Sequence, residues 1–203
     1  MGLLSVVSGQ LRLATSNGVL TADHGQTASR LPIDLTGPNI PFMRSPGSIS
    51  LSECLSPATI QLNLAATDAE TVLAELVDCV PAIRDRPEDR QTLLRALHER
   101  EQLHSTGIGD GVALPHARNA LIGLVDRPVI VFGRSAQGIP YSAIDGAPAR
   151  LFFLIVAPTV TQHLAVLARV SRMLRDPKVR QDLLKSESAS EALAVIRAAE
   201  ENL

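Results

Sequence analysis

Several side chains that can act as acid, base, nucleophile or anion ligand lie close together in the stretch 100–118, REQLHSTGIGDGVALPHAR. They are Arg100, Glu101, His104, Asp110 and His116. A neutral imidazole can attack an electrophile and then carry a covalent group. A guanidinium beside it stabilises an arriving phosphoryl group, and a carboxylate orients the ring by accepting a hydrogen bond. The stretch therefore predicts a nucleophilic histidine, with transfer of a phosphoryl group as a chemistry that fits these residues.

Other chemistries for the same stretch have weaker support. The glycines at 107–111 follow an expected helix rather than a strand, and no helix opens after them, which disfavours a dinucleotide-binding loop. No GxxxxGK[ST] motif occurs, so a P-loop is not supported. His98 and His104 are not spaced to share one helix face, and no cysteine joins them. A zinc-dependent hydrolase remains an open alternative, with the candidate ligands His98, His104, His116 and His163.

The elements around this stretch explain how its side chains would be positioned. Pro87 can start a helix that runs to about residue 103 and carries Arg100 near its end. A glycine-rich turn over 105–111 and a short apolar segment over 112–114 then lead to His116. The preceding proline fixes the backbone there, so the imidazole is expected at a strand end, facing a crevice.

The rest of the chain after residue 48 alternates strand and helix patterns. Continuous apolar runs at 129–132 and 151–156 are typical of strands buried on both faces. Residues 133–149 look like a loop. The pattern predicts an α/β fold: one domain, with a mixed central sheet flanked by helices on both faces. The other expected elements are a strand at 59–64 and helices from Thr67 or Asp68 to about 83, 160–174, 176–185 and 189–201.

The first 48 residues differ from the remainder because they are rich in proline and glycine and show no sustained helical or strand periodicity of apolar residues. We expect residues 1–48 to be a poorly ordered extension with one short strand around 6–14, and residues 49–203 to form the domain. Met43 stands just before the domain pattern begins. One hypothesis is that the native chain starts there, which mass spectrometry of its N-terminus would test.

Composition excludes several classes of protein. The formal charge is −2, from 19 basic and 21 acidic residues, and aromatic residues make up 2%. This balance argues against nucleic acid as a partner. No apolar run approaches the ~18–20 residues of a membrane span, so no membrane insertion is expected. The cysteines form no CxxC pair, which favours a reducing compartment and a cytoplasmic location. Nothing in the sequence calls for a cofactor or a metal.

The stretch 100–118 resembles the active-site signature of the mannitol/fructose-type (type 2) enzyme IIA domain of the bacterial phosphotransferase system. Its STGIG loop is similar to that of the nitrogen-regulatory branch and of the fructose-type proteins. A second segment, 138–174, also resembles the family, with an IDG loop, a buried strand and a helix headed by a histidine. The resemblance covers residues 50–203.

The resemblance implies a role for each matched residue. His116 corresponds to the phosphorylated histidine, and His163 to the second active-site histidine beside it. Arg100 corresponds to the active-site arginine. Asp110 falls where mannitol-type members have glutamate and nitrogen-regulatory members have asparagine. The loop residues that would shape the phosphate site are Thr106, Gly109 and Gly111.

As a function, the resemblance implies a phosphotransferase that acts as a phosphocarrier. A histidine phosphocarrier protein would be the donor, and a IIB domain or a regulatory target the acceptor. The nitrogen-regulatory type is favoured. The alternatives are a stand-alone IIA component of a fructose- or mannitol-type sugar transporter, and a non-catalytic IIA-like binding module.

Overall fold

The computed structural model describes residues 5–7, 10–12 and 49–203. The first two of these parts are strands β1 (Ser5–Val7) and β2 (Gln10–Arg12), which pair antiparallel. Two short strands therefore replace the single one expected around residues 6–14. The remainder of the expected extension, including Met43, lies outside the described residues.

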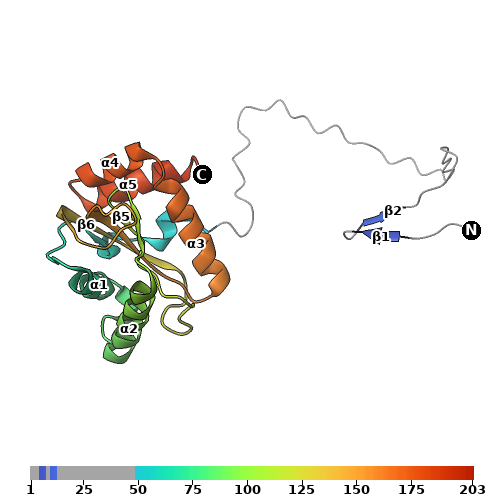
Figure 1. Ribbon diagram of the computed structural model, residues 1–203, viewed down its shortest axis with the longest axis horizontal. Helices are drawn as coiled ribbons and strands as arrows, with labels where there is room; N and C mark the ends of the chain where they lie inside the picture. Colours follow the sequence, from blue (N-terminus) through green and yellow to red (C-terminus); the bar gives the residue numbers. More distant parts are fainter. Residues whose placement is uncertain (1–4, 8–9, 13–48) are drawn as a thin grey trace, which may run out of the picture. The chain divides into compact units, whose positions relative to one another are not determined.

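Residues 49–203 form an α/β domain, as the sequence predicts (Figure 1). Its elements in chain order are η1 (Ser52–Cys54), η2 (Pro57–Thr59), β3 (Ile60–Gln61), α1 (Ala69–Asp78), η3 (Pro81–Ile83), α2 (Pro87–Leu103), β4 (Gly107–Gly109), β5 (Val112–Ala113), β6 (Val129–Ile139), β7 (Ala149–Val156), α3 (Val160–Met173), α4 (Pro177–Lys185) and α5 (Ala189–Glu200).

The central sheet is mixed and has five strands in the order β3-β6-β7-β5-β4. The long strands β6 and β7 pair antiparallel at its centre. On either side, β3 pairs parallel with β6 and β5 pairs parallel with β7. The edge strand β4 pairs antiparallel with β5. A site at the end of β5 therefore lies beside β7, the middle strand of the sheet.

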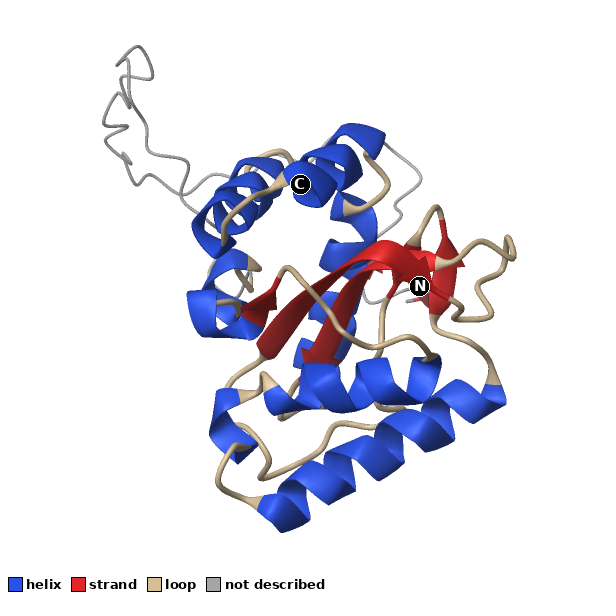
Figure 2. Ribbon diagram, turned by 90° about the vertical axis from the view of Figure 1, so that its left-hand side faces the viewer, coloured by secondary structure: helices blue, strands red, loops and turns tan. Residues whose placement is uncertain are grey.

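Alternation along β7 explains why helices cover both faces of the sheet. Leu151, Phe153 and Ile155 join the apolar cluster that includes α3, α4 and α5. Phe152 and Leu154 point the other way, into the cluster that includes α1 and α2. Figure 2 shows the sheet between these two helical layers. Each such side chain contributes roughly 1.5–3 kcal/mol by leaving water, so the strand anchors both layers.

Polar caps set the helix starts. Asp68 accepts a hydrogen bond from the backbone N–H of Thr71 at 2.8 Å and begins α1. Asp176 does the same for α4, and α2 starts at Pro87 as expected. However, α1 ends at Asp78 rather than near residue 83. The backbone of Val80 is extended because it precedes a proline, and a separate 3-10 helix follows.

The expected loop over residues 133–149 is wrong in its first half. Strand β6 continues through Ile139 and stays paired with β7, although its register shifts between Arg134 and Ile139. Gly138 has a φ of +82° inside this irregular section. A glycine in the expected loop therefore lies at an irregularity within the strand. Two smaller differences are that β3 is shorter than the expected strand 59–64, and that the glycine turn 105–111 contains β4.

None of the helices in the described part of the chain is long and apolar enough to cross a membrane.

Candidate active site

His116 lies just after the end of the short strand β5, beside β7. The backbone pairing of the two strands extends to a parallel bridge between His116 and Ile155. The N–H of Ile155 also donates to the carbonyl of Pro115 at 2.9 Å. The His116 side chain is half-buried. Its backbone is therefore held by the rigid centre of the sheet, as expected for a site that must be precise.

The imidazole of His116 has a defined tautomer. Its Nδ1 lies 2.7 Å from the carbonyl oxygen of Leu114. A carbonyl oxygen only accepts, so Nδ1 must carry the hydrogen of the neutral ring. The lone pair is then on Nε2, which makes Nε2 the nucleophilic nitrogen.

His163 approaches this ring from the first turn of α3. Thr159 caps the helix by accepting from the N–H of Gln162 at 3.3 Å, and its carbonyl accepts the N–H of His163. The His163 residue is only 6% exposed. The ring centroids of His116 and His163 are 5.4 Å apart and tilted by 48°. The first turn of α3 therefore lies beside the imidazole pair, where the helix dipole favours an anionic group.

Both rings are held in their neutral forms. Burial lowers the pKa of His116 from its ordinary 6.5, and the positive charge of Arg100 lowers it further. The bond to Leu114 and the charge of Glu101 oppose this shift of the pKa. The pKa of His163 is lowered by burial and by His116. At neutral pH the Nε2 lone pair of His116 is therefore available.

Arg100 lies near the end of α2, and its Nη1 donates to the carbonyl of His104 at 2.7 Å. Arg100, Leu103 and Arg118 line a cavity of about 650 Å³ that reaches Ala117, the residue after His116. Asn119 lines this cavity as well as a smaller recess that includes His163. The charge of Arg100 lowers the pKa of His116, so the guanidinium lies near that imidazole.

Thr106 connects the end of α2 to the strand that carries His116. It is buried, and its carbonyl accepts the N–H of Leu114 at 3.0 Å. Its own N–H donates to both carboxylate oxygens of Glu101, and its hydroxyl donates to the same group at 2.6 Å. The family resemblance assigned no site role to Glu101. The signal for it is a carboxylate at a helix end, shortly before a Ser-Thr pair.

Asp110, Gly109 and Gly111 lie elsewhere, at the tip of the β4–β5 hairpin. Asp110 pairs with Arg180 of α4 at 3.1 Å, and its N–H donates to Asp145 at 2.8 Å. The carbonyl of Gly111 accepts the N–H groups of residues 150 and 151. All three residues have positive φ angles, as a tight turn requires. The structure therefore does not bring these three residues to the histidine pair.

The remaining histidines give no support to a metal centre. The described residues include no group of three or more His, Cys, Asp or Glu side chains that could hold a metal ion. His98 lies on α2, where its Nε2 is buried and has no hydrogen-bond partner in the described part of the chain. The side chain of His104 is exposed.

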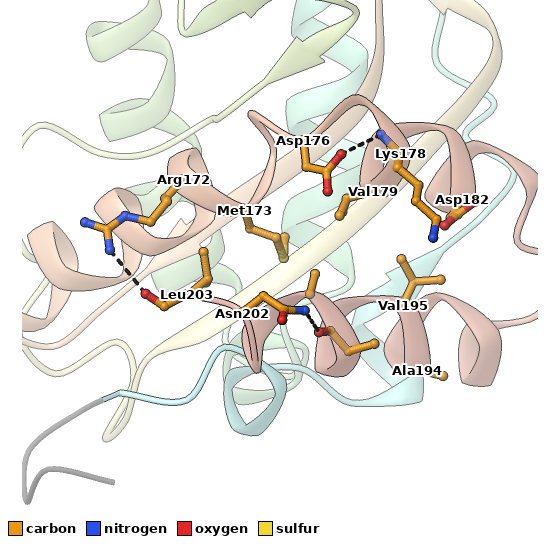
Figure 3. A pocket seen from close by; sticks show the side chains of 12 residues that line it. Arg172, Met173, Asp176, Lys178, Val179, Asp182, Ala194, Val195, Asn202 and Leu203 are labelled. Carbon is orange, nitrogen blue, oxygen red and sulfur yellow. Dashed lines mark hydrogen bonds between the residues drawn. The ribbon is translucent and has the colours of Figure 1, made fainter. Parts of the chain in front are cut away.

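A cavity of about 500 Å³ between α4, α5 and the end of α3 is separate from this site (Figure 3). Its rim is polar, with Arg172 donating to the carbonyl of Leu203 and Asn202 donating to that of Ala198. None of the residues predicted to be functional lines it.

Residues 53–199 match the sequence profile of the phosphoenolpyruvate-dependent sugar phosphotransferase system EIIA 2 family. The chain belongs to this family. The family resemblance inferred from residues 100–118 and 138–174 is confirmed.

Relatives of this EIIA 2 domain fall into two groups. It is 37% identical over 150 residues to the PTS system fructose-specific EIIABC component of Bacillus subtilis, covering 73% of this chain and 23% of that protein. It is 33% identical over 148 residues to the nitrogen regulatory protein of Pseudomonas aeruginosa, covering 71% of this chain and 92% of that one. The chain thus spans about a quarter of the Bacillus relative.

Solved structures share the fold. The crystal structure of nitrogen regulatory protein IIA-Ntr from Neisseria meningitidis superposes with a TM-score of 0.62 at 28% identity, covering 71% of this chain and 97% of that one. A complex of enzyme IIAMtl with phosphorylated enzyme IIBMtl from Escherichia coli contains the same fold, with a TM-score of 0.61 at 22% identity, covering 71% and 97%.

Proposed function

We propose that this EIIA 2 domain accepts a phosphoryl group on Nε2 of His116 from a histidine phosphocarrier protein and passes it on. The observation that carries the proposal is the pair of neutral imidazoles, with centroids 5.4 Å apart and the Nδ1 of His116 engaged by Leu114. That bond leaves Nε2 as the free nucleophile on the polar side of the ring.

The transfer exchanges one phosphorus–nitrogen bond for another. The lone pair on Nε2 of His116 attacks phosphorus, and the donor imidazole leaves with the electron pair of the broken bond. Nδ1 of His116 keeps its hydrogen throughout and continues to donate it to the Leu114 carbonyl. Arg100 and the N-terminus of α3 then stabilise the negative charge of the transferred group, and a ring N–H of His163 donates to a phosphoryl oxygen.

Exposed apolar side chains flank the site and favour docking of a protein partner. Leu103 is 55% exposed and lines the cavity beside Ala117. Val160 and Leu164, on the same turns of α3 as His163, are 58% and 57% exposed. Large exposed apolar groups beside a polar centre are typical of protein interfaces. A protein donor and a protein acceptor, such as a IIB domain, fit this rim.

Phosphoryl acceptance is tested with purified phosphoenolpyruvate, enzyme I and the phosphocarrier protein. We expect label on the wild type and none on His116→Ala, because the nucleophile is gone. His163→Ala should accept label more slowly. The matched control is His104→Ala, which removes an exposed imidazole nearby and should label normally. Full labelling of His116→Ala would refute the proposal.

Within this function we favour the nitrogen-regulatory type, because the STGIG loop at 105–109 is similar to that branch. The alternative is a IIA component of a fructose- or mannitol-type transporter. A chase of the labelled domain with a fructose-type IIB domain separates the two. Rapid transfer to that IIB would favour the transporter component, and retention of label would favour the regulatory type.

The second alternative is a IIA-like module that only docks partners. The presence of both histidines and Arg100 speaks against it. A domain that binds the phosphocarrier protein but takes no label from it would establish this alternative instead.

A further inference from the structure

We infer that Glu101 is a positioning residue for His116: through Thr106 and Leu114 it holds the imidazole in the tautomer that leaves Nε2 free. This inference rests on the proposed function, since it concerns the same imidazole. It adds a residue that neither contacts the histidine nor belongs to the matched set of site residues.

The carboxylate of Glu101 is fully used by neighbours on the loop that follows α2. It accepts the N–H of Thr106 at 2.9 and 3.1 Å and the Thr106 hydroxyl at 2.6 Å. It also accepts the hydroxyl of Tyr141 at 3.2 Å. Thr106 is 3% exposed and Tyr141 is 2% exposed, so these bonds form in a setting where water competes little.

Two further hydrogen bonds lead from Thr106 to the imidazole. The carbonyl of Thr106 accepts the N–H of Leu114 at 3.0 Å. The carbonyl of Leu114 then accepts the Nδ1 hydrogen of His116 at 2.7 Å. A shift of Thr106 therefore moves the Leu114 backbone, and with it the acceptor that selects the tautomer.

Tyr141 stabilises the arrangement from the other side of the loop. Its hydroxyl is bonded to Glu101, and its carbonyl accepts the hydroxyl of Ser105. The Ser105 hydroxyl oxygen in turn accepts the N–H of Gly107 at 3.0 Å. The residues on both sides of Thr106 are thus connected to Tyr141 through the Ser105 hydroxyl. Glu101 is the member that contacts Thr106 directly, which makes it the sensitive position.

The adjacent residues Arg100 and Glu101 act on His116 in different ways. Arg100 faces the cavity beside Ala117, where an incoming phosphoryl group needs positive charge. Glu101 accepts hydrogen bonds from Thr106 and Tyr141 and so holds the backbone of the loop in place. Its negative charge also raises the pKa of His116, whereas Arg100 lowers it. Substituting the two residues should therefore affect the reaction differently.

The test uses the full chain and the nitrogen-15 NMR signals of the His116 ring, which distinguish the two neutral tautomers. Glu101→Gln keeps the size of the side chain but leaves only one good acceptor oxygen for three donors. We expect the Nδ1–H tautomer to lose population. We also expect the kcat of phosphoryl acceptance to fall by about tenfold, with the KM for the phosphocarrier protein nearly unchanged.

Two further variants keep the test decisive if Glu101→Gln folds poorly. Thr106→Val removes only the hydroxyl and should give a smaller change in the same direction, while Thr106→Ser should restore the wild-type signals. The matched control is Glu88→Gln, an exposed position on the first turn of α2. It should change neither readout.

The outcomes separate this inference from the proposed function. If folded Glu101→Gln and Thr106→Val show wild-type nitrogen signals, the positioning role is refuted, whatever the rate. If the wild type accepts no label, the proposed function fails, and the ring signals still decide whether Glu101 sets the tautomer.

Discussion

The two ends of the segment 110–116 each carry an ionisable side chain, Asp110 at one end and His116 at the other, but the two side chains are bonded differently. At the hairpin tip, Asp110 is paired with Arg180, and its N–H is bonded to Asp145. At the other end, His116 bonds through Nδ1 to the Leu114 carbonyl, which leaves Nε2 as the nitrogen that we propose accepts the phosphoryl group. The polar groups at the tip are bonded to their neighbours, whereas the proposed function gives the strand end a ring nitrogen for the reaction.

Strand geometry separates these ends. Gly111 bonds to residues 150 and 151 of β7, whereas His116 pairs with Ile155. An extended chain rises ~3.3 Å per residue, so the ends are about 15–20 Å apart. Closeness in sequence is therefore a poor guide to a shared site when the intervening residues form a strand.

The comparison is tested most strongly by its two arginines, one at each end. Arg100→Gln should slow phosphoryl acceptance by about 100-fold, because it removes positive charge from the site of transfer. Arg180→Gln should change the rate less than about twofold. It removes bonds to Asp110 and to the carbonyl groups of Leu174 and Arg175, which support structure alone. Rapid-quench labelling measures both rates, and equal effects would contradict the separation of the two ends.

The second prediction concerns pH. The pKa of His116 is lowered, so acceptance should stay constant around neutrality and decline only below the ordinary imidazole value of 6.5. Below the midpoint the neutral fraction falls about tenfold per pH unit. In Arg100→Gln the midpoint should move upward, because Arg100 helps to lower that pKa. Asp110→Asn at the other end should leave the profile in place.

Folding stability should follow the same titration. Protonation of a ring whose pKa is lowered in the folded state favours the unfolded chain. The stability that His116 and His163 contribute is therefore present above pH 6.5 and is lost as pH falls through their lowered pKa values. Urea unfolding of His163→Gln across this range should show a weaker loss on acidification. A steeper loss would reverse the assigned direction.

Local signals in the sequence were sufficient for the helix starts. Asp68, Pro87 and Asp176 mark starts that the structure confirms, because caps and prolines act within a few residues. The second half of β6 was missed. Its glycines and polar residues satisfy no simple alternation, and its pairing with β7 is a long-range contact that no local pattern encodes.

The candidate site also contains residues that the sequence placed correctly and residues that it did not. The sequence expectation placed His163 beside His116, and the rings do lie next to each other. It also grouped Asp110 with them, because a linear motif does not show that a strand separates its members. Glu101 was among the candidate side chains, but no local pattern predicted what it would contact. Its partners Thr106 and Tyr141 are bonded to it only after the loop has folded.

Substitutions at Gly107 and Gly111 test the same difference between the two ends, with smaller expected effects. A Cβ on Gly107 would lie 2.8 Å from the Cα of Ala143, so Gly107→Ala must displace backbone next to Thr106. We expect a loss of about 1–3 kcal/mol in stability and slower phosphoryl acceptance. Gly111→Ala meets nothing closer than 3.9 Å but has a φ of +74°. It should cost about 1 kcal/mol and leave the rate unchanged. Slower transfer in Gly111→Ala would mean that the tip takes part in the reaction.

The smallest expected effect belongs to Asp110→Asn. The side chain of Asp110 is 73% exposed, so its ion pair with Arg180 is weakened by water and salt. Asparagine tolerates the positive φ of 54° at this position. Stability should therefore change by less than about 0.5 kcal/mol, measured by chemical unfolding. Acceptance of label should equal that of the wild type, because the carboxylate lies at the opposite end of the strand from His116. A rate loss as large as that of Arg100→Gln would return Asp110 to the reaction, for instance through a donor protein that reaches the hairpin tip.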